Sequence, residues 1–380
     1  NIAPTALCRN VVLPLNANGQ ASVSASNLNN GSFDNCGQVT FSASQTSFDC
    51  SDVGDNAVTL TVTDANGNSS TCTSTVTIVD NVAPVAVCQD ITVQLISTGV
   101  ASISASDIDN GSTDACGIDT MYVDQIDFDC SHVGNNTVTL TVVDNNGNTS
   151  TCTATVTVED VTPPTAVCQD ITVQLDAAGE VSISASLVDN GSSDACGVAS
   201  LAVSQEDFDC SHVGDNTVTL TVTDVNGNSS TCTSTVTVED NVAPSAVCQD
   251  VTVQLDANGL ASITASQIDG GSSDACGIDT VYLDQYDFDC SNLGSSNIVT
   301  LTVVDVNGNS STCTTDVTVE DNIAPSISCT GDIVVSNDAG ECGAIVTYNT
   351  PSGNDNCTST TITQTDTTGL SSGSFFPVGT

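Results

Sequence analysis

The sequence has no lysine and no tryptophan, and Arg9 is its one arginine. Against that single cation stand 46 acidic residues, which gives a formal net charge of -45 at pH 7. Because so acidic a chain repels nucleic acid and anionic lipid surfaces, it argues against nucleic acid as a partner. Aromatic residues make up only 3% of the chain, so each hydrophobic core must be small and aliphatic.

No apolar run is long enough to span a bilayer, and no signal-peptide pattern opens the chain. We therefore expect no membrane insertion within this segment, and we expect targeting signals and any anchor to lie outside it. No pair of cysteines is separated by only two residues, and wider spacings do not suit a zinc knuckle. The cysteines are therefore better explained as disulfide partners.

Hydrophobic residues are nevertheless 39% of the chain, and they alternate with polar ones, which distinguishes it from a disordered acidic chain. The 19 cysteines would stay reduced in a cytosol, so their number indicates an oxidising, extracellular compartment at or near a cell surface. Small cores of this kind gain from covalent cross-links.

The cysteines recur with a period of 80 residues, which indicates an array of similar modules. The predicted modules are repeat 1 (residues 1–80), repeat 2 (81–160), repeat 3 (161–240), repeat 4 (241–321) and a partial, divergent repeat 5 (322–380). Repeat 4 carries one extra residue within the segment 295–298.

Each module contains segments whose alternating apolar and polar residues are typical of β-strands. In repeat 2 the segments 91–95 and 101–105 alternate with period two around Gly99, which predicts a hairpin. A second hairpin joins 137–143 to 153–158 through an Asn- and Gly-rich turn. About seven short strands in a module of this length, without helical periodicity, predict an all-β, immunoglobulin-like β-sandwich. Modules strung through short, Pro-bound linkers predict a tandem array in an elongated rod.

Oxygen-bearing side chains gather in three places that we expect to meet at each junction between modules: the linker, the loop after the second strand, and the loop between the last two strands. Hard divalent cations prefer six to eight oxygen ligands, so these groups predict Ca²⁺ sites. The candidate ligands are Asp80, Asn81, Asp109, Asp114, Asp144, Asn146, Asn148, Glu159, Asp160, Asp189, Asp194, Asp224, Asn226, Asn228, Glu239, Asp240, Asp269, Asp274, Asp305, Asn307 and Asn309. The alternative is turn chemistry alone, since Asp and Asn side chains hydrogen-bond their own backbone in tight turns.

Four cysteines in a module allow three pairings, and the sequence does not decide among them. We expect parallel first and last strands to join Cys8–Cys72, and a hairpin near Ala43 to join Cys36–Cys50. The same scheme predicts Cys88–Cys152, Cys116–Cys130, Cys168–Cys232, Cys196–Cys210, Cys248–Cys313 and Cys276–Cys290. Repeat 5 argues against the scheme, because it has Pro377 near the place of Cys50 and would need the additional Cys342 to pair with Cys357.

Nothing in the sequence indicates an enzyme. His132 and His212 stand where the other repeats carry Asp52 and Asn292, so that position needs only a polar side chain. The segment 369–373 matches the Gly-x-Ser-x-Gly pattern of hydrolases, but it lacks the preceding strand, the following helix and a histidine base. We therefore expect no catalytic residue and no organic cofactor.

The segments Ala83–Leu95 and Val138–Cys152, with linkers such as Val238–Asn241, resemble the hyalin-type (HYR-like) repeats of giant surface proteins of Bacteroidota. The segment Ile333–Gly343 looks like the commoner form of that repeat. The resemblance implies an immunoglobulin-like fold, type 9 secretion, and a role in adhesion or gliding motility. It also implies O-glycosylation at Thr120 and Thr280.

These patterns together predict a structural and adhesive stalk whose disulfides staple each module and whose junctions are stiffened by Ca²⁺. Its partners would be neighbouring repeats of the same long chain, together with a surface or polysaccharide ligand that the sequence does not identify. One alternative is a self-assembling filament subunit that pairs with identical chains through open strand edges. A second is an array of carbohydrate-binding modules, which the scarcity of aromatic residues disfavours.

Overall fold

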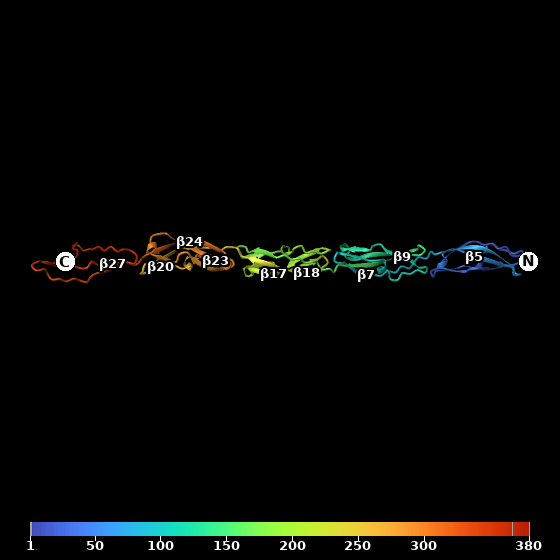
Figure 1. The fold of residues 1–380 in the computed structure, drawn as a ribbon, viewed down its shortest axis with the longest axis horizontal. Coiled ribbons are helices and arrows are strands. Elements are labelled where there is room, and N and C mark those ends of the chain that lie inside the picture. Colours follow the sequence, from blue (N-terminus) through green and yellow to red (C-terminus); the bar gives the residue numbers. More distant parts are fainter. Residues whose placement is uncertain (1, 367, 380) are drawn as a thin grey trace. The chain divides into compact units, whose positions relative to one another are not determined.

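A computed structural model describes residues 2–366 and 368–379. The chain divides into two compact units, Asn1–Val167 with Gly191–Ala202 and Thr221–Cys232, and Cys168–Asn190 with Val203–Leu220 and Thr233–Thr380. Repeats 1 and 2 belong to the first unit and repeats 4 and 5 to the second, whereas repeat 3 contributes to both. Figure 1 colours the repeats along the chain, from β5 of repeat 1 in blue to β27 of repeat 5 in red.

Repeats 1 to 4 share one order of elements. The first strands are β1 (Val11–Pro14), β7 (Ile91–Gln94), β13 (Ile171–Gln174) and β19 (Val251–Gln254). The second strands are β2 (Gln20–Ser22), β8 (Val100–Ser102), β14 (Glu180–Ser182) and β20 (Leu260–Ser262). A single helical turn follows each of these, namely α1 (Ala25–Leu28), α2 (Ala105–Ile108), α3 (Ala185–Val188) and α4 (Ala265–Ile268).

The second half of each repeat holds the longer strands. The third strands are β3 (Thr40–Ala43), β9 (Ile118–Val123), β15 (Val198–Val203) and β21 (Ile278–Leu283). The fourth strands, β4 (Ser47–Asp49), β10 (Asp127–Asp129), β16 (Asp207–Asp209) and β22 (Asp287–Asp289), run into the 3-10 turns η1 (Cys50–Asp52), η2 (Cys130–His132), η3 (Cys210–His212) and η4 (Cys290–Asn292). The long closing strands are β5 (Gly54–Thr63) and β6 (Ser69–Val79), β11 (Gly134–Asp144) and β12 (Thr149–Glu159), β17 (Gly214–Asp224) and β18 (Ser229–Glu239), and β23 (Asn297–Asp305) and β24 (Ser310–Glu320).

Each of these repeats is an immunoglobulin-like sandwich of a four-stranded and a two-stranded sheet. The four-stranded sheets follow the orders β1-β6-β5-β3, β7-β12-β11-β9, β13-β18-β17-β15 and β19-β24-β23-β21. In each, the first strand runs parallel to the last, as the pairing of Ile91 with Val156 shows in repeat 2. The second and fourth strands form the small sheet, with Phe128 of β10 opposite Ala101 of β8.

The core lies between the two sheets. In repeat 2, β11 alternates buried Val138, Leu140 and Val142, each 0% exposed, with outward-facing threonines. Phe128 from the small sheet packs into the same cluster. Fully burying a side chain of this size stabilises the fold by about 1.5–3 kcal/mol. The predicted hairpin between 137–143 and 153–158 is confirmed by the antiparallel pairing of β11 and β12.

The other predicted hairpin is wrong. Gly99 does turn the chain, and its N–H donates to the Ile96 carbonyl oxygen at 2.8 Å. The strands on either side of that turn, however, enter different sheets, because β7 pairs with β12 and β8 pairs with β10. The single-turn helices were also not predicted, since four residues are too few to show a helical period.

Repeat 5 has four short strands, β25 (Ser326–Ser328), β26 (Gly343–Val346), β27 (Ser352–Asn354) and β28 (Ser374–Pro377). They form two separate pairs, β25 with β27 and β26 with β28. No helix among the described residues is long and apolar enough to cross a membrane.

Candidate functional site: the junctions between repeats

One kind of disulfide joins the segment just before the first strand of a repeat to the last strand of the same repeat. Cys8 pairs with Cys72, Cys88 with Cys152 and Cys248 with Cys313. These are the pairs expected from parallel first and last strands, and each closes a loop with a sequence separation of 64 or 65 residues. Cys168 and Cys232 of repeat 3 are also disulfide-bonded.

A second kind of disulfide joins one repeat to the next. The pairs are Cys50–Cys116, Cys130–Cys196, Cys210–Cys276 and Cys290–Cys357. In each, the first cysteine lies in the 3-10 turn of one repeat, and the second lies in a loop of the repeat that follows. We call these bonds staples, and we number the junctions first to fourth from the N-terminus.

The staples correct four predicted pairs within repeats, which are Cys36–Cys50, Cys116–Cys130, Cys196–Cys210 and Cys276–Cys290. The prediction assumed a hairpin that would place Cys36 opposite Cys50. Instead β3 joins the large sheet and β4 joins the small one. Because its flanking strands belong to different sheets, the turn near Ala43 does not bring these two cysteines together, and Cys50 faces the next repeat.

The expected pair Cys342–Cys357 is also wrong, because Cys357 is stapled to Cys290. Cys36, Cys329 and Cys342 are exposed and free among the described residues. Repeat 5 held the signal that could have revealed the staples: it has a counterpart of Cys116 but none of Cys50. Pairing Cys357 with the preceding repeat removes the need for Cys342.

The staple cysteines also pack against the preceding repeat. Cys116 lies against the hydrophobic core of repeat 1, and Cys196 lies against that of repeat 2. The turn at Gly99 comes so close that a Cβ there would meet the Cys130 sulfur at 2.9 Å and the Ala195 Cβ at 3.1 Å. Only a residue without a side chain, at a φ of +74°, allows this approach.

The loop between the last two strands is held by turn chemistry. Asp144 is 1% exposed, and its Oδ1 accepts hydrogen bonds from the backbone N–H groups of Asn146 and Asn148, both at 2.8 Å. The Asn148 amide nitrogen donates to Asp144 Oδ2 at 2.8 Å. In repeat 3, burial disfavours ionisation of Asp224, but hydrogen bonds led by that of Asn228 outweigh it and lower the pKa of Asp224.

The same asparagine reaches the linker. The Asn148 amide nitrogen donates to the Asp80 carbonyl oxygen at 3.2 Å, and Asn309 does the same to Asp240 at 3.0 Å. The structure therefore brings the linker and this loop together at the junction, as the sequence predicted. The amide nitrogen of the asparagine faces the linker carbonyl, however, so that carbonyl is already engaged.

A buried carboxylate lies at each of the first three junctions. Asp80 is 8% exposed, and its Oδ1 accepts from the Val82 N–H at 3.0 Å. Its Oδ2 is buried and has no hydrogen-bond partner among the described residues. Asp160 and Asp240 repeat this arrangement, with Oδ2 again unpartnered.

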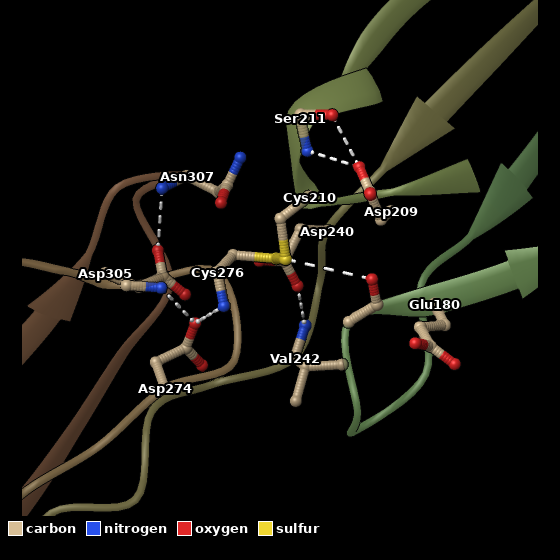
Figure 2. The surroundings of a disulfide bond; sticks show 12 residues. Glu180, Asp209, Cys210, Ser211, Asp240, Val242, Asp274, Cys276, Asp305 and Asn307 are labelled. Carbon is tan, nitrogen blue, oxygen red and sulfur yellow. Dashed lines mark hydrogen bonds between the residues drawn. A yellow bond between two sulfur atoms is a disulfide. The ribbon is translucent and has the colours of Figure 1, made fainter.

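A second carboxylate and the staple lie close to this carboxylate. One ligand atom each from Asp80, Asp114 and Cys116 lie within 4.8 Å of one another. Asp160, Asp194 and Cys196 form the same group, as do Asp240, Asp274 and Cys276. Figure 2 shows the third junction, with Asp240 and Asp274 on either side of the Cys210–Cys276 bond. Since the sulfur is in a disulfide, only the carboxylates can serve as ionic ligands.

The remaining predicted acidic ligands lie outside these groups. Asp109 and Asp269 accept from backbone N–H groups of their own loops, and the Ser112 and Ser272 hydrogen bonds lower their pKa values. The Glu239 carboxylate accepts from the Gln174 amide at 2.6 Å on the neighbouring strand. The predicted acidic ligands that are not part of the close groups are Asp109, Asp144, Glu159, Asp189, Asp224, Glu239, Asp269 and Asp305. Of the predicted asparagines, Asn148, Asn228 and Asn309 donate their amide nitrogens to the linker carbonyls. Metal binding by Asn81, Asn146, Asn226 and Asn307 stays a prediction.

The fourth junction has an asparagine next to its second staple cysteine. Asn356 stands where the other junctions have Ala115, Ala195 and Ala275. Its amide nitrogen donates to Asp321 Oδ1 at 3.1 Å, so the linker carboxylate there has a neutral donor. Asp321 and Asp355 are not among the close groups, although Asp355 Oδ1 is itself without a partner.

The two histidines lie in 3-10 turns, and the two threonines proposed for O-glycosylation lie on edge strands. His132 Nδ1 lies 2.8 Å from Asp129 Oδ1 at the start of η2, where Asn292 accepts the Asp289 N–H in repeat 4. The Ser131 hydroxyl, which donates to Asp129, is the main cause of the lowered pKa of that aspartate. Thr120 and Thr280 are exposed on β9 and β21, at the edge of their sheets.

The fold and the junctions define a class: tandem immunoglobulin-like repeats that are disulfide-bonded both within and between modules. The HYR domain family matches residues 159–238 and 320–380. Hyalin of Strongylocentrotus purpuratus is 30% identical over 240 residues, which is 60% of this chain and 20% of the relative's length. These two segments are similar to HYR domains, and the chain spans about a fifth of this relative.

Solved structures with a similar fold are immunoglobulin and cadherin arrays. The protocadherin GammaB4 extracellular domain is 12% identical with a TM-score of 0.32, over 92% of this chain and 70% of that one. Sidekick-1 immunoglobulin domains 1-5 are 10% identical with a TM-score of 0.30, over 84% and 81%. The titin fragment I67-I69 is 10% identical with a TM-score of 0.33, over 63% and 100%. At these values the likeness concerns the fold alone.

Proposed function

We propose that the chain is a structural segment of a secreted, adhesion-type surface protein, whose repeats transmit tension through disulfides rather than through the fold alone. The observation that carries the proposal is the staple at every junction from repeat 1 to repeat 5. A chain that served only to space two domains would not need covalent bonds between adjacent modules. The disulfides and the HYR-like repeats both support an extracellular location.

The finer form of the proposal is a bacterial stalk of the kind found in giant adhesins, such as the gliding-motility adhesin SprB, whose repeats the motifs resemble. Secretion by the type 9 system and a role in gliding belong to this form, and the motif resemblance supports it. The exposed threonines Thr120 and Thr280 are accessible for the proposed O-glycosylation.

Pulling the oxidised chain from its two ends is the experiment that tests the proposal. The disulfide between Cys88 and Cys152 holds a loop with a sequence separation of 64 residues, which would extend by roughly 200 Å if it were released. In single-molecule force spectroscopy we expect no step of that size from the oxidised chain, and repeated steps at least that long after addition of a thiol reductant. Long steps from the oxidised chain would contradict the proposal.

A further inference from the structure

The first three junctions each place a buried carboxylate beside a half-buried one. Ligand oxygens of Asp240 and Asp274 lie within 4.8 Å of each other, and Asp240 is only 7% exposed. Two ionised carboxylates at this distance in a buried place repel each other strongly. A cation or a proton between two such groups relieves this repulsion.

The chain offers no cationic side chain for this purpose. Arg9 is its only arginine and it has no lysine. Arg9 donates from Nε to the Asn27 carbonyl oxygen in repeat 1 at 2.7 Å, and the two histidines bond to Asp129 and Asp209. Neutralisation at the junctions must therefore come from solution.

Each carboxylate is fixed by its own turn, with one oxygen left over. Asp240 Oδ1 accepts from the Val242 N–H at 3.0 Å, and Asp274 Oδ1 accepts from the Cys276 N–H at 2.8 Å. Asp240 Oδ2 is buried and unpartnered, and Figure 2 shows both side chains beside the staple. Burying a charged oxygen without a partner is costly, so three repetitions of it indicate that a ligand supplies the partner.

We propose that Asp80 with Asp114, Asp160 with Asp194, and Asp240 with Asp274 each bind one Ca²⁺, with water completing the coordination. Carboxylate oxygens are the ligands that this hard cation prefers, and Ca²⁺ accepts an irregular geometry. Bound at both the linker and the next repeat, the ion would add an ionic restraint to the staple. The inference rests on the proposed function only in using the stapled junction as its scaffold.

The fourth junction is a natural control. Asn356 donates with its amide to Asp321 Oδ1, which also accepts from the Ile323 N–H, so the linker carboxylate of this junction has a side-chain donor that alanine cannot supply at the other three. Placing the same residue at the third junction, as Ala275→Asn, keeps both carboxylates and should bring an amide to Asp240. The chain already accommodates asparagine at this position beside the Gly259 turn.

Isothermal titration calorimetry of the oxidised full chain with Ca²⁺ at physiological ionic strength tests the proposal. We expect three sites per chain, two sites in Asp240→Asn and two in Ala275→Asn. Asp321→Asn, the matched control at the fourth junction, should retain three. A Mg²⁺ titration under the same conditions should give much weaker binding, because Mg²⁺ demands a stricter geometry.

Equal stoichiometry in all variants would show that Ca²⁺ merely screens the acidic surface, and it would overturn the proposal. Absence of binding by the wild-type chain would also overturn it, leaving a shared proton as the explanation. Disulfide mapping of each sample distinguishes a failure of the metal proposal from a failure of the proposed function. If the staples are present without Ca²⁺ binding, the metal proposal fails and the stapled segment stands; if the staples are absent, the proposed function fails.

Discussion

Cutting the linker between repeats 1 and 2 is expected to leave the two parts of the chain covalently joined. A protease site inserted between Val82 and Ala83 lies outside the loops closed by Cys8–Cys72 and Cys88–Cys152. It lies inside the loop closed by Cys50–Cys116. After cleavage, a denaturing gel without reductant should show one species of unchanged mass, and a gel with reductant should show two fragments.

The matched control is Cys50→Ser with Cys116→Ser in the same chain. This variant should fall into two fragments on both gels, because no other disulfide crosses the cut at the first junction. The same test distinguishes the Cys50–Cys116 pairing from the Cys36–Cys50 pairing. If Cys36 were paired with Cys50, as the sequence suggested, the unaltered chain would separate without reductant too, and the account of the junctions would be wrong.

Removing the disulfide within repeat 2 should produce the largest loss of stability. Cys88 and Cys152 close a loop with a sequence separation of 64 residues. Because the cross-link lowers the conformational entropy of the unfolded chain, we expect its removal to lower the free energy of unfolding by about 4 kcal/mol. The overlapping staples at both junctions also restrain the unfolded repeat, so this figure is an upper value. Since about 1.4 kcal/mol corresponds to a tenfold change, hydrogen exchange of the β11 and β12 amides should accelerate by up to roughly a thousandfold.

Mass spectrometry of deuterium uptake in Cys88→Ser with Cys152→Ser is the measurement. Cys36→Ser provides the control, because Cys36 is exposed and has no disulfide. We expect that variant to exchange at the wild-type rate throughout repeat 2. Similar exchange in both variants would mean that hydrophobic packing around Leu140 alone determines the stability of the module.

The sequence predicted those parts of the fold that depend on local pattern. Alternation of Val138, Leu140 and Val142 with threonines predicted β11, and its partner followed from the Asn- and Gly-rich turn. The parallel first and last strands then indicated which cysteines would meet within a module. In each case the determining contacts lie on one pair of strands.

The staples depend on which sheet a short strand joins, and that choice is not a local one. β8 has three residues, and its pattern suits either sheet equally well. Only the packing of Phe128 and Ala101 on the core places β8 beside β10, and this pairing directs Cys130 toward the next repeat. The prediction instead placed β10 and its counterparts in a hairpin with the preceding strand, which mispaired Cys130 and its counterparts but left pairs such as Cys88–Cys152 correct.

The candidate metal ligands were predicted as a group but not as individuals. The residue types are equally suited to turns and to cation binding, so the sequence could not separate Asp144 from Asp80. Hydrogen bonds make the distinction: both oxygens of Asp144 accept from its own loop, whereas Asp80 keeps one buried oxygen without a partner. Such a difference appears only once the loops are folded against the linker.

Disulfide mapping of the unreduced chain tests the central claim most directly. A protease specific for aspartate cuts between all the cysteines concerned, since Asp34, Asp49 and Asp114 flank them. Mass spectrometry should recover the peptide containing Cys50 joined to the peptide containing Cys116, with Cys36 alkylated as a free thiol. Recovery of Cys36 joined to Cys50 would confine the disulfides to single modules and contradict the proposal that the repeats are covalently linked across their junctions.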